Sequence, residues 1–161
     1  MSKLILFTDG SWNAQKKNGY GAYLMVGEHE LSFDSFGTRI KVKRFENSSS
    51  TKLELQTLIW ALAEIQKTDQ KIVVYTDSQN IIGLPARRSR LELNDYRSRK
   101  NELLNNHALY REFYRLTDLL DCEWIKVHGH LSSNKKDDFD RFFTLVDRAS
   151  RKALKEDSQS L

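Results

Sequence analysis

The sequence holds a single cysteine, Cys122, and a single proline among its 161 residues. One cysteine cannot form an internal disulfide, so a disulfide-stapled fold is excluded and a reducing, cytoplasmic setting is expected. No linker rich in proline and glycine, internal repeat or low-complexity tract divides the chain. We therefore expect one domain over residues 1–161, with a disordered tail at 156–161.

Long apolar runs are also missing. The longest ones fall far short of the ~20 residues that cross a bilayer, and the N-terminus begins a strand-like run, not a charged segment before a long apolar one. We therefore expect neither a membrane span nor a targeting segment. With 39% hydrophobic and 11% aromatic residues, the chain still has enough apolar material for a sizeable core.

Two similar runs, 3–9 and 71–77, organise the sequence. Each is rich in strand-forming residues and ends in Thr-Asp, at Asp9 and at Asp77. An apolar run that stops on a carboxylate is typical of a buried strand whose first polar side chain stands at its carboxyl end. If the two strands are parallel neighbours, Asp9 and Asp77 meet at the edge where such sheets bind ligands.

The other segments complete a mixed sheet. Three expected strands are followed by a helix that crosses over to the second Thr-Asp strand. Long helices then precede and follow a last strand. The expected strands are 3–9, 19–26, 31–42, 71–77 and 123–127, and the expected long helices are 51–66, 108–120 and a last one ending near 155. The fold class is therefore α/β, with a five-stranded mixed sheet, an antiparallel meander plus parallel strands, flanked by helices.

Two carboxylates have ordinary structural explanations. Residues 51–54, Thr-Lys-Leu-Glu, match a capping box in which Glu54 binds the backbone at the helix start. Asp77 could cap a short helix over 77–83. The alternative is that both side chains join Asp9, because the first turn of the crossover helix can lean over the strand ends. The residues alone leave both explanations open.

Residues 84–106 are locally basic, although the net charge of the whole chain is only +4. This segment carries Tyr96 among six basic side chains: Arg87, Arg88, Arg90, Arg97, Arg99 and Lys100. Arginines mixed with an aromatic residue suit contact with a phosphate backbone. The alternative is a solvated helical face with Glu and Arg paired at helical spacing.

Six short motifs, in order, resemble the type 1 ribonuclease H family. They are Thr8-Asp9-Gly10-Ser11, Gly19-Tyr20-Gly21-Ala22, Leu53-Glu54-Leu55, Thr76-Asp77-Ser78-Gln79, residues 124–130 (Trp-Ile-Lys-Val-His-Gly-His) and Val146-Asp147-Arg148-Ala149. The ordered set covers essentially the whole chain. The resemblance implies a ribonuclease H-like fold and an endonuclease that hydrolyses the RNA strand of RNA–DNA hybrids, largely without sequence preference.

The same resemblance implies a site with two Mg²⁺ ions, Mn²⁺ being the alternative ion. Asp9, Glu54, Asp77 and Asp147 match the metal-binding carboxylates, and His130 matches the histidine that assists proton transfer or product release. Phosphodiester hydrolysis independently needs an activated water, stabilised charge and a protonated leaving oxygen, and two hard cations supply the first two. Four crowded carboxylates would repel one another without cations. A zinc site is not expected, because His128 and His130 lack further Cys or His ligands at suitable spacing.

The sequence departs from the common family pattern beside these motifs. The usual Gly-Asn-Pro-Gly turn is absent after Asp9, which leaves Asn13 as a contact to the hybrid. Ser50 and Thr51 stand where many relatives have asparagines that touch the RNA 2′-hydroxyl, and Gln79 is a further expected substrate contact.

The stretch between His130 and Asp147 is longer than in the common pattern, so Asp140 competes for the fourth carboxylate. The likeness of residues 146–153 to the family's terminal helix favours Asp147. Residues 84–106 occupy the place of the family's hybrid-binding protrusion. In that context we expect its six basic side chains to contact the hybrid.

The expected partner is an RNA–DNA hybrid, recognised by its 2′-hydroxyls and groove shape. We expect no membrane association, no obligate protein partner and a monomer. Two alternatives remain: a hybrid-binding module without catalysis, or another nuclease or DNA-strand transferase on the same fold. Four carboxylates argue against the first, and the lack of room for extra domains argues against the second.

Overall fold

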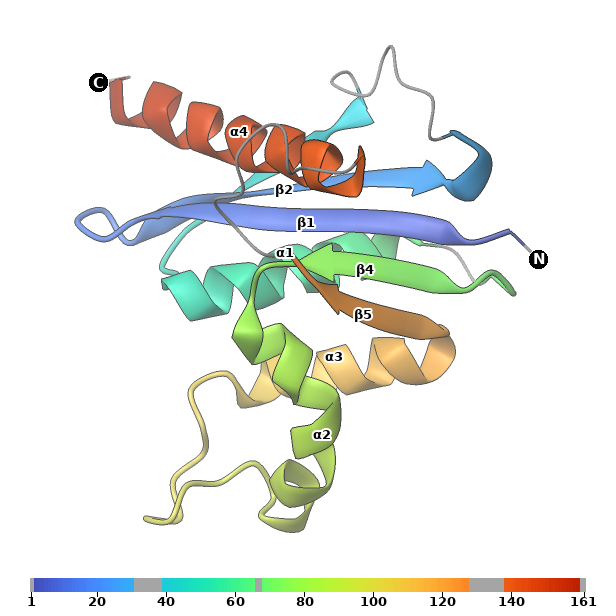
Figure 1. Ribbon diagram of the computed structural model, residues 1–161. Helices are drawn as coiled ribbons and strands as arrows, with labels where there is room; N and C mark the ends of the chain where they lie inside the picture. The colour runs from blue at the N-terminus through green and yellow to red at the C-terminus, as the bar shows by residue number, and fades with distance from the viewer. Residues whose placement is uncertain (1, 31–38, 66–67, 128–137, 160–161) are drawn as a thin grey trace.

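The computed structural model describes residues 2–30, 39–65, 68–127 and 138–159 (Figure 1). Its elements, in chain order, are β1 (Leu4–Asn13), β2 (Asn18–Gly27), the 3₁₀ helix η1 (Glu28–Glu30), β3 (Lys41–Phe45), α1 (Ser50–Glu64), β4 (Ile72–Thr76), α2 (Gln79–Leu93), α3 (His107–Leu119), β5 (Cys122–Lys126) and α4 (Asp138–Gln159). None of the helices in these ranges is long and apolar enough to span a membrane.

The strands form one sheet in the order β3-β2-β1-β4-β5. β1 pairs antiparallel with β2 and parallel with β4, while β2–β3 is antiparallel and β4–β5 parallel. The predicted five-stranded mixed sheet is therefore confirmed. Of the strand expected at 31–42, residues 31–38 lie outside the described residues, and β3 begins at Lys41.

Helices cover both faces of the sheet (Figure 1). Side chains that alternate along β1 point to opposite faces and belong to two separate apolar cores. Leu6 belongs to the core shared with α1 and α3, whereas Ile5 and Phe7 belong to the core shared with α4. Because side chains alternate along a strand, the series on the α4 side continues through Asp9 and Ser11. The sequence thus directs the Asp9 carboxylate toward α4.

Close packing holds the first turns of α1 against the strands. A Cβ atom on Gly21 would lie 2.0 Å from Thr57 Oγ1, and one on Gly19 would lie 2.6 Å from the Leu53 side chain. Thr57 is fully buried, and its hydroxyl donates to the Leu53 carbonyl at 2.8 Å. These two glycines therefore allow a helix to approach β2 at a distance that no larger residue permits.

The structure rules out the capping alternative for both Glu54 and Asp77. α1 begins at Ser50 and its cap is Ser49, whose hydroxyl accepts from the Lys52 amide, so Glu54 does not stand at the capping-box position. α2 is capped by Ser78, whose hydroxyl accepts from the Ile81 amide. In each case a serine next to the expected start provides the cap, which leaves Glu54 and Asp77 available for other contacts.

α2 is longer than the short helix expected over 77–83. It continues to Leu93 through Pro85, and residues 94–106 then form an irregular loop. The backbone of this loop has positive φ at Asp95, Tyr96 and Asn101. The basic segment is thus half helix and half loop.

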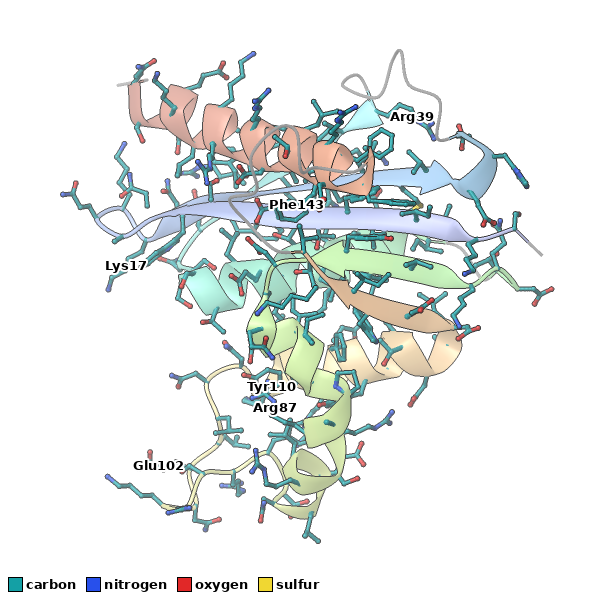
Figure 2. All side chains as sticks on the ribbon, in the orientation of Figure 1. Lys17, Arg39, Arg87, Glu102, Tyr110 and Phe143 are labelled. Carbon is teal, nitrogen blue, oxygen red and sulfur yellow. The ribbon has the colours of Figure 1, made fainter. Side chains whose placement is uncertain are left out.

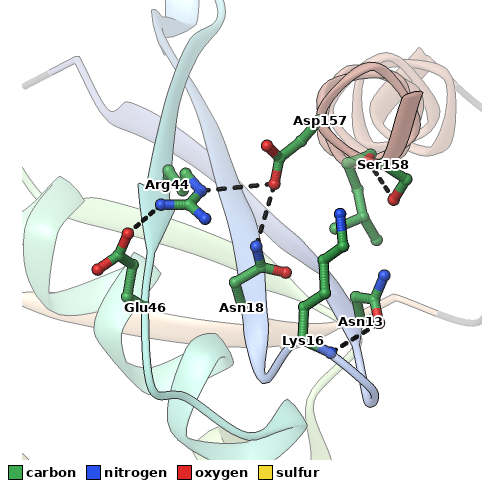
Figure 3. Close-up of polar contacts among 8 residues, drawn as sticks. Asn13, Lys16, Asn18, Arg44, Glu46, Asp157 and Ser158 are labelled. Carbon is green, nitrogen blue, oxygen red and sulfur yellow. Dashed lines mark hydrogen bonds and ion pairs between the residues drawn. The ribbon is translucent and has the colours of Figure 1, made fainter. Parts of the chain in front are cut away.

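α4 is fastened to the sheet at both ends. Near its start, Phe139 stacks on Tyr75 with ring centroids 5.1 Å apart, and Tyr75 stacks on Phe7 at the same distance. Near its end, Asp157 accepts from Asn18 Nδ2 at 3.0 Å and pairs with Arg44 Nε at 3.4 Å (Figure 3).

These contacts correct the disorder expected for the tail at residues 156–159, which are helical. The sequence offered no local sign of this order, because Asn18 and Arg44 lie more than 100 residues away along the chain. Residues 160 and 161 lie outside the described part.

Candidate active site

The site begins where two parallel strands carry their carboxylates. β1 and β4 run in register from Leu4 opposite Ile72 to Phe7 opposite Tyr75. Asp9 lies two residues beyond the last of these pairs, and Asp77 directly follows β4. The structure thus brings the two Thr-Asp motifs to the same edge of the sheet, as the sequence predicted.

Glu54 reaches this edge from the first turns of α1. Its Oε2 accepts a hydrogen bond of 2.7 Å from the hydroxyl of Ser78, the residue after Asp77. Ser78 is only 4% exposed, so water competes little with this bond. A buried hydroxyl therefore ties the third carboxylate to the end of β4.

Asp147 completes the group from α4. Its carboxyl group shares a hydrogen bond with Asp9, and Arg151 Nε donates to its Oδ1 at 3.0 Å. Asp140 lies about two turns earlier on α4. Asp147 contributes to the raised pKa values of both Asp9 and Asp77, so it lies within the carboxylate cluster.

Burial and mutual repulsion perturb the ionisation of this cluster. Burial, followed by the hydrogen bond with Asp147 and the charge of Asp77, raises the pKa of Asp9 from 3.8 to about 9. Burial also raises the pKa of Glu54, with Asp77 adding to the effect and the Ser78 hydroxyl opposing it.

Asp77 is more accessible to solvent than the other carboxylates, yet the surrounding protein displaces enough water to raise its pKa. The neighbouring Asp147 charge adds to this increase, and Lys126 and Arg151 reduce it. Burial and repulsion among the carboxylates therefore outweigh the positive charge that Lys126 and Arg151 bring to Asp77.

The chemistry of the donor set fits hard divalent cations. All four side chains offer only carboxylate oxygens, the ligands that Mg²⁺ and Mn²⁺ prefer, and a bound cation would offset the repulsion that raises these pKa values. Within the described ranges, no group of three or more His, Cys, Asp and Glu side chains is arranged as a metal-binding set.

Histidines expected near the site fall outside the described residues. β5 ends at Lys126, and both His128 and His130 follow within the undescribed segment 128–137. The role predicted for His130 therefore stays a prediction.

At the end of β5, Lys126 Nζ donates a hydrogen bond to Gln79 Oε1 at 2.8 Å. The two amide hydrogens of Gln79 remain as its hydrogen-bond donors.

Two of the six basic side chains of segment 84–106 have partners on helices α2 and α3. Arg87 donates to Asn80 Oδ1 at 2.6 Å, and its guanidinium faces the ring of Tyr110 (Figure 2). Arg88 forms a bidentate pair with Asp118 at 2.5 and 2.8 Å and lies over the Tyr114 ring. These two arginines join α2 to α3.

The other four basic side chains are exposed. Arg97 donates to the Asn101 carbonyl at 3.0 Å within the loop. Among the described residues, none forms a hydrogen bond or an ion pair with the side chain of Arg90, Arg99 or Lys100. These charges remain available to an external anion.

The remaining predicted substrate contacts lie on the elements that carry or adjoin the carboxylates. Ser50 and Thr51 are the exposed first residues of α1, and Gln79 is the exposed first residue of α2. Asn13 ends β1, where its side-chain oxygen accepts from the amides of Gln15 and Lys16 and shapes the hairpin (Figure 3).

Sequence reasoning missed the residues that support the carboxylates. Ser78 was visible only as part of a motif, and its pairing with Glu54 depends on the crossover geometry. Arg151 could have been found, because it follows Asp147 by four residues and such pairs meet on a helix. Lys126 had no local signal, since its partner Gln79 lies 47 residues away.

Comparison with known proteins gives matches along most of the chain. A family model described as RNase H matches residues 1–153. The chain is also 26% identical over 147 residues to a protein named Ribonuclease H from Acetivibrio thermocellus, an alignment that covers 89% of this chain and 94% of that protein.

Solved structures share the fold. The solution structure of the PFV RNase H domain superposes with a TM-score of 0.71 at 15% identity, covering 94% of this chain and 93% of that one. A foamy viral protease-reverse transcriptase in complex with RNA/DNA hybrid gives a TM-score of 0.66 at 8% identity. That match covers 94% of this chain but only 19% of the longer viral chain.

Proposed function

The chain belongs to the ribonuclease H family, and from that premise we propose that it is an endonuclease that hydrolyses the RNA strand of RNA–DNA hybrids. The observation that supports this proposal is the convergence of Asp9, Glu54, Asp77 and Asp147, from four separate elements, at the carboxyl edge of the sheet. Hydrolysis of a phosphodiester needs such a concentration of oxygen ligands for cations.

The four carboxylates would hold two Mg²⁺ ions, with Mn²⁺ as the alternative. Bound there, the cations would supply an activated water and stabilise the negative charge that develops on the phosphate. Asp9, on the central strand, interacts with both Asp77 and Asp147 and would serve both ions. Ser78 keeps the Glu54 carboxylate aimed at the cluster, and Arg151 does the same for Asp147.

A proton must still reach the leaving 3′ oxygen. We assign this task to His130, because an imidazole has a pKa near neutral pH and this residue follows β5 by four positions. Its family motif is the support for this assignment.

We propose that hybrid recognition is shared between two groups of residues. Ser50, Thr51, Gln79 and Asn13 stand on or beside the segments that carry the carboxylates and would contact the RNA strand, where 2′-hydroxyls distinguish RNA from DNA. Arg90, Arg97, Arg99 and Lys100 would contact backbone phosphates, which carry no sequence information. Arg87 and Arg88 shape this region from within, so we assign their main contribution to structure.

The proposal extends to the setting of the protein. A chain with one cysteine suits a reducing cytoplasm, and we propose that it works there as a monomer on free hybrid duplexes. We treat residues 1–161 as one domain, with segment 84–106 as its hybrid-binding part.

A panel of labelled duplexes tests the proposal. RNA–DNA hybrid, duplex DNA and duplex RNA are incubated with the protein, each with Mg²⁺ or with EDTA. We expect Mg²⁺-dependent loss of the RNA strand of the hybrid alone. Binding of the hybrid without any cleavage would instead indicate a binding module, and cleavage of duplex DNA would indicate another nuclease.

Two matched variants on α4 test the fourth carboxylate. Asp147→Asn should remove cleavage, whereas Asp140→Asn should retain most of it. Because both changes remove one negative charge from the same helix, the opposite result would transfer the metal-binding role to Asp140.

A further inference from the structure

Two serine hydroxyls connect the middle of α4 to β1. The Oγ atoms of Ser11 and Ser150 lie 2.9 Å apart, and Ser150 Oγ also donates to the backbone carbonyl of Asp147 at 2.9 Å. Ser11 follows Asp9 by two residues on the same face of β1, and Ser150 follows Asp147 by three residues on α4. The Ser11–Ser150 pair therefore joins β1 to α4 just as the Asp9–Asp147 pair does, two residues further along β1 and three residues further along α4.

The chemistry of these groups fixes the direction of the hydrogen bonds. A carbonyl oxygen only accepts, so the single proton of the Ser150 hydroxyl is committed to Asp147. The bond between the two serines must then use the proton of Ser11. The chain of donors runs from Ser11 through Ser150 to the backbone of Asp147.

The location of Ser150 makes this chain specific. Its side chain is fully buried, at 0% exposure, so water cannot readily replace a lost partner of the Ser150 hydroxyl. Other contacts also hold α4 on the sheet: the Phe139 stack and the Asp157 contacts at its ends, and apolar packing of Val146 against Ile5 and Phe7 of β1. The serine pair adds a directional hydrogen bond to β1 within one helical turn of Asp147.

We propose that Ser11 and Ser150 are positioning residues, which set the register of α4 on β1 so that the carboxylates of Asp147 and Asp9 can bind the same cations. This inference rests on the proposed function and extends it. Neither serine is assigned to touch substrate or metal. Both act through the backbone of Asp147.

A purely structural role is the competing explanation, and it predicts a different result. If the pair only stabilised the fold, its loss would lower the melting temperature and leave cation affinity unchanged. Alanine at position 150 also favours a helix more than serine does, which limits the loss of stability. Affinity and stability can therefore be separated.

The test is calorimetric titration of the folded protein with Mg²⁺, without nucleic acid. We expect Ser150→Ala and Ser11→Ala each to weaken Mg²⁺ binding by about tenfold, the lower end of what loss of a ligand-orienting partner costs. Ser11→Thr keeps a hydroxyl on a strand residue and should restore wild-type affinity. Asp157→Ala is the matched control: it releases the far end of α4, so it should lower the melting temperature without changing Mg²⁺ affinity.

Two results would overturn the inference while leaving the nuclease proposal intact. One is wild-type Mg²⁺ affinity in both alanine variants. The other is an equal loss of affinity in Asp157→Ala, which would mean that any loosening of α4 has the same effect. If the wild-type protein neither binds Mg²⁺ nor cuts hybrid, the proposed function fails first and the positioning role fails with it.

Discussion

The carboxylate cluster and the basic segment 84–106 are built in opposite ways. The cluster gathers side chains from β1, α1, α4 and the end of β4, and buries them enough to raise three of their pKa values. The segment is continuous in sequence, and its charges either pair within the protein or stay in water. Chemistry thus depends on tertiary structure here, whereas contact with a long polyanion needs only local charge.

The largest effect is expected when one carboxylate of the cluster is removed, because cleavage should be lost while hybrid binding is kept. Asp9→Asn should lower hydrolysis of the hybrid by about 10³-fold or more, because cation-assisted hydrolysis depends on several kcal/mol of charge stabilisation. Hybrid affinity in EDTA should stay close to wild type, since the basic segment is unchanged. The measurements are single-turnover cleavage and equilibrium binding. Unchanged cleavage would remove Asp9 from the site.

A triple change in the segment should give the reverse pattern. Arg90, Arg99 and Lys100 replaced by alanine should weaken hybrid binding and reduce the slope of log affinity against log salt by roughly 2 to 3, since each lost phosphate contact removes about 0.7 to 0.9. Cleavage at saturating hybrid should persist. Binding titrations at several salt concentrations provide the measurement.

Arg88→Ala is the internal control for that experiment. Arg88 holds Asp118 and Glu92 and lies over Tyr114, so its loss should lower the melting temperature and change the salt slope little. A slope change in Arg88→Ala as large as in the triple variant would show that the internal pairs open to reach the hybrid.

The smallest expected effect is on stability against pH without divalent cations. Asp9 ionises near pH 3.8 in an unfolded chain but only at about 9 in the folded protein. The folded state therefore binds more protons between these values, so stability should fall as pH rises through that window. The raised pKa values of Glu54 and Asp77 act in the same direction.

Melting temperatures in EDTA between pH 5 and pH 8.5 would measure this effect. The decline should be smaller in Asp9→Asn, which cannot ionise, and smaller in wild type when Mg²⁺ replaces EDTA. An equal decline in the variant would mean that the cluster does not control the pH dependence.

The sequence was sufficient where local pattern and topology agree. Asp9 and Asp77 end two similar strand-like runs, and a crossover helix between them makes the strands parallel neighbours, so their meeting was predictable. Glu54 was ambiguous for a physical reason: Ser49, Ser50 and Thr51 can all cap a helix, and local sequence does not decide which one does. Only the tertiary contact with Ser78 distinguishes a capping glutamate from a site residue.

The sequence predicts how many charged side chains the basic segment carries, but not which of them pair with other residues of the protein. Nothing near Arg88 in the sequence indicates Asp118, which lies 30 residues away on α3. The helical order of residues 156–159 likewise depends on Asn18 and Arg44, on β2 and β3. In both cases a distant partner decides whether a charged side chain is free or fixed.

The Ser78 hydroxyl connects helix α2 to the Glu54 carboxylate. It accepts from the Ile81 amide at the start of α2 and donates to Glu54 on α1, so it belongs at once to the helix that leads to the basic segment and to the carboxylate cluster. A tilt of α2 would therefore shift the Ser78 hydroxyl and, through it, the Glu54 carboxylate.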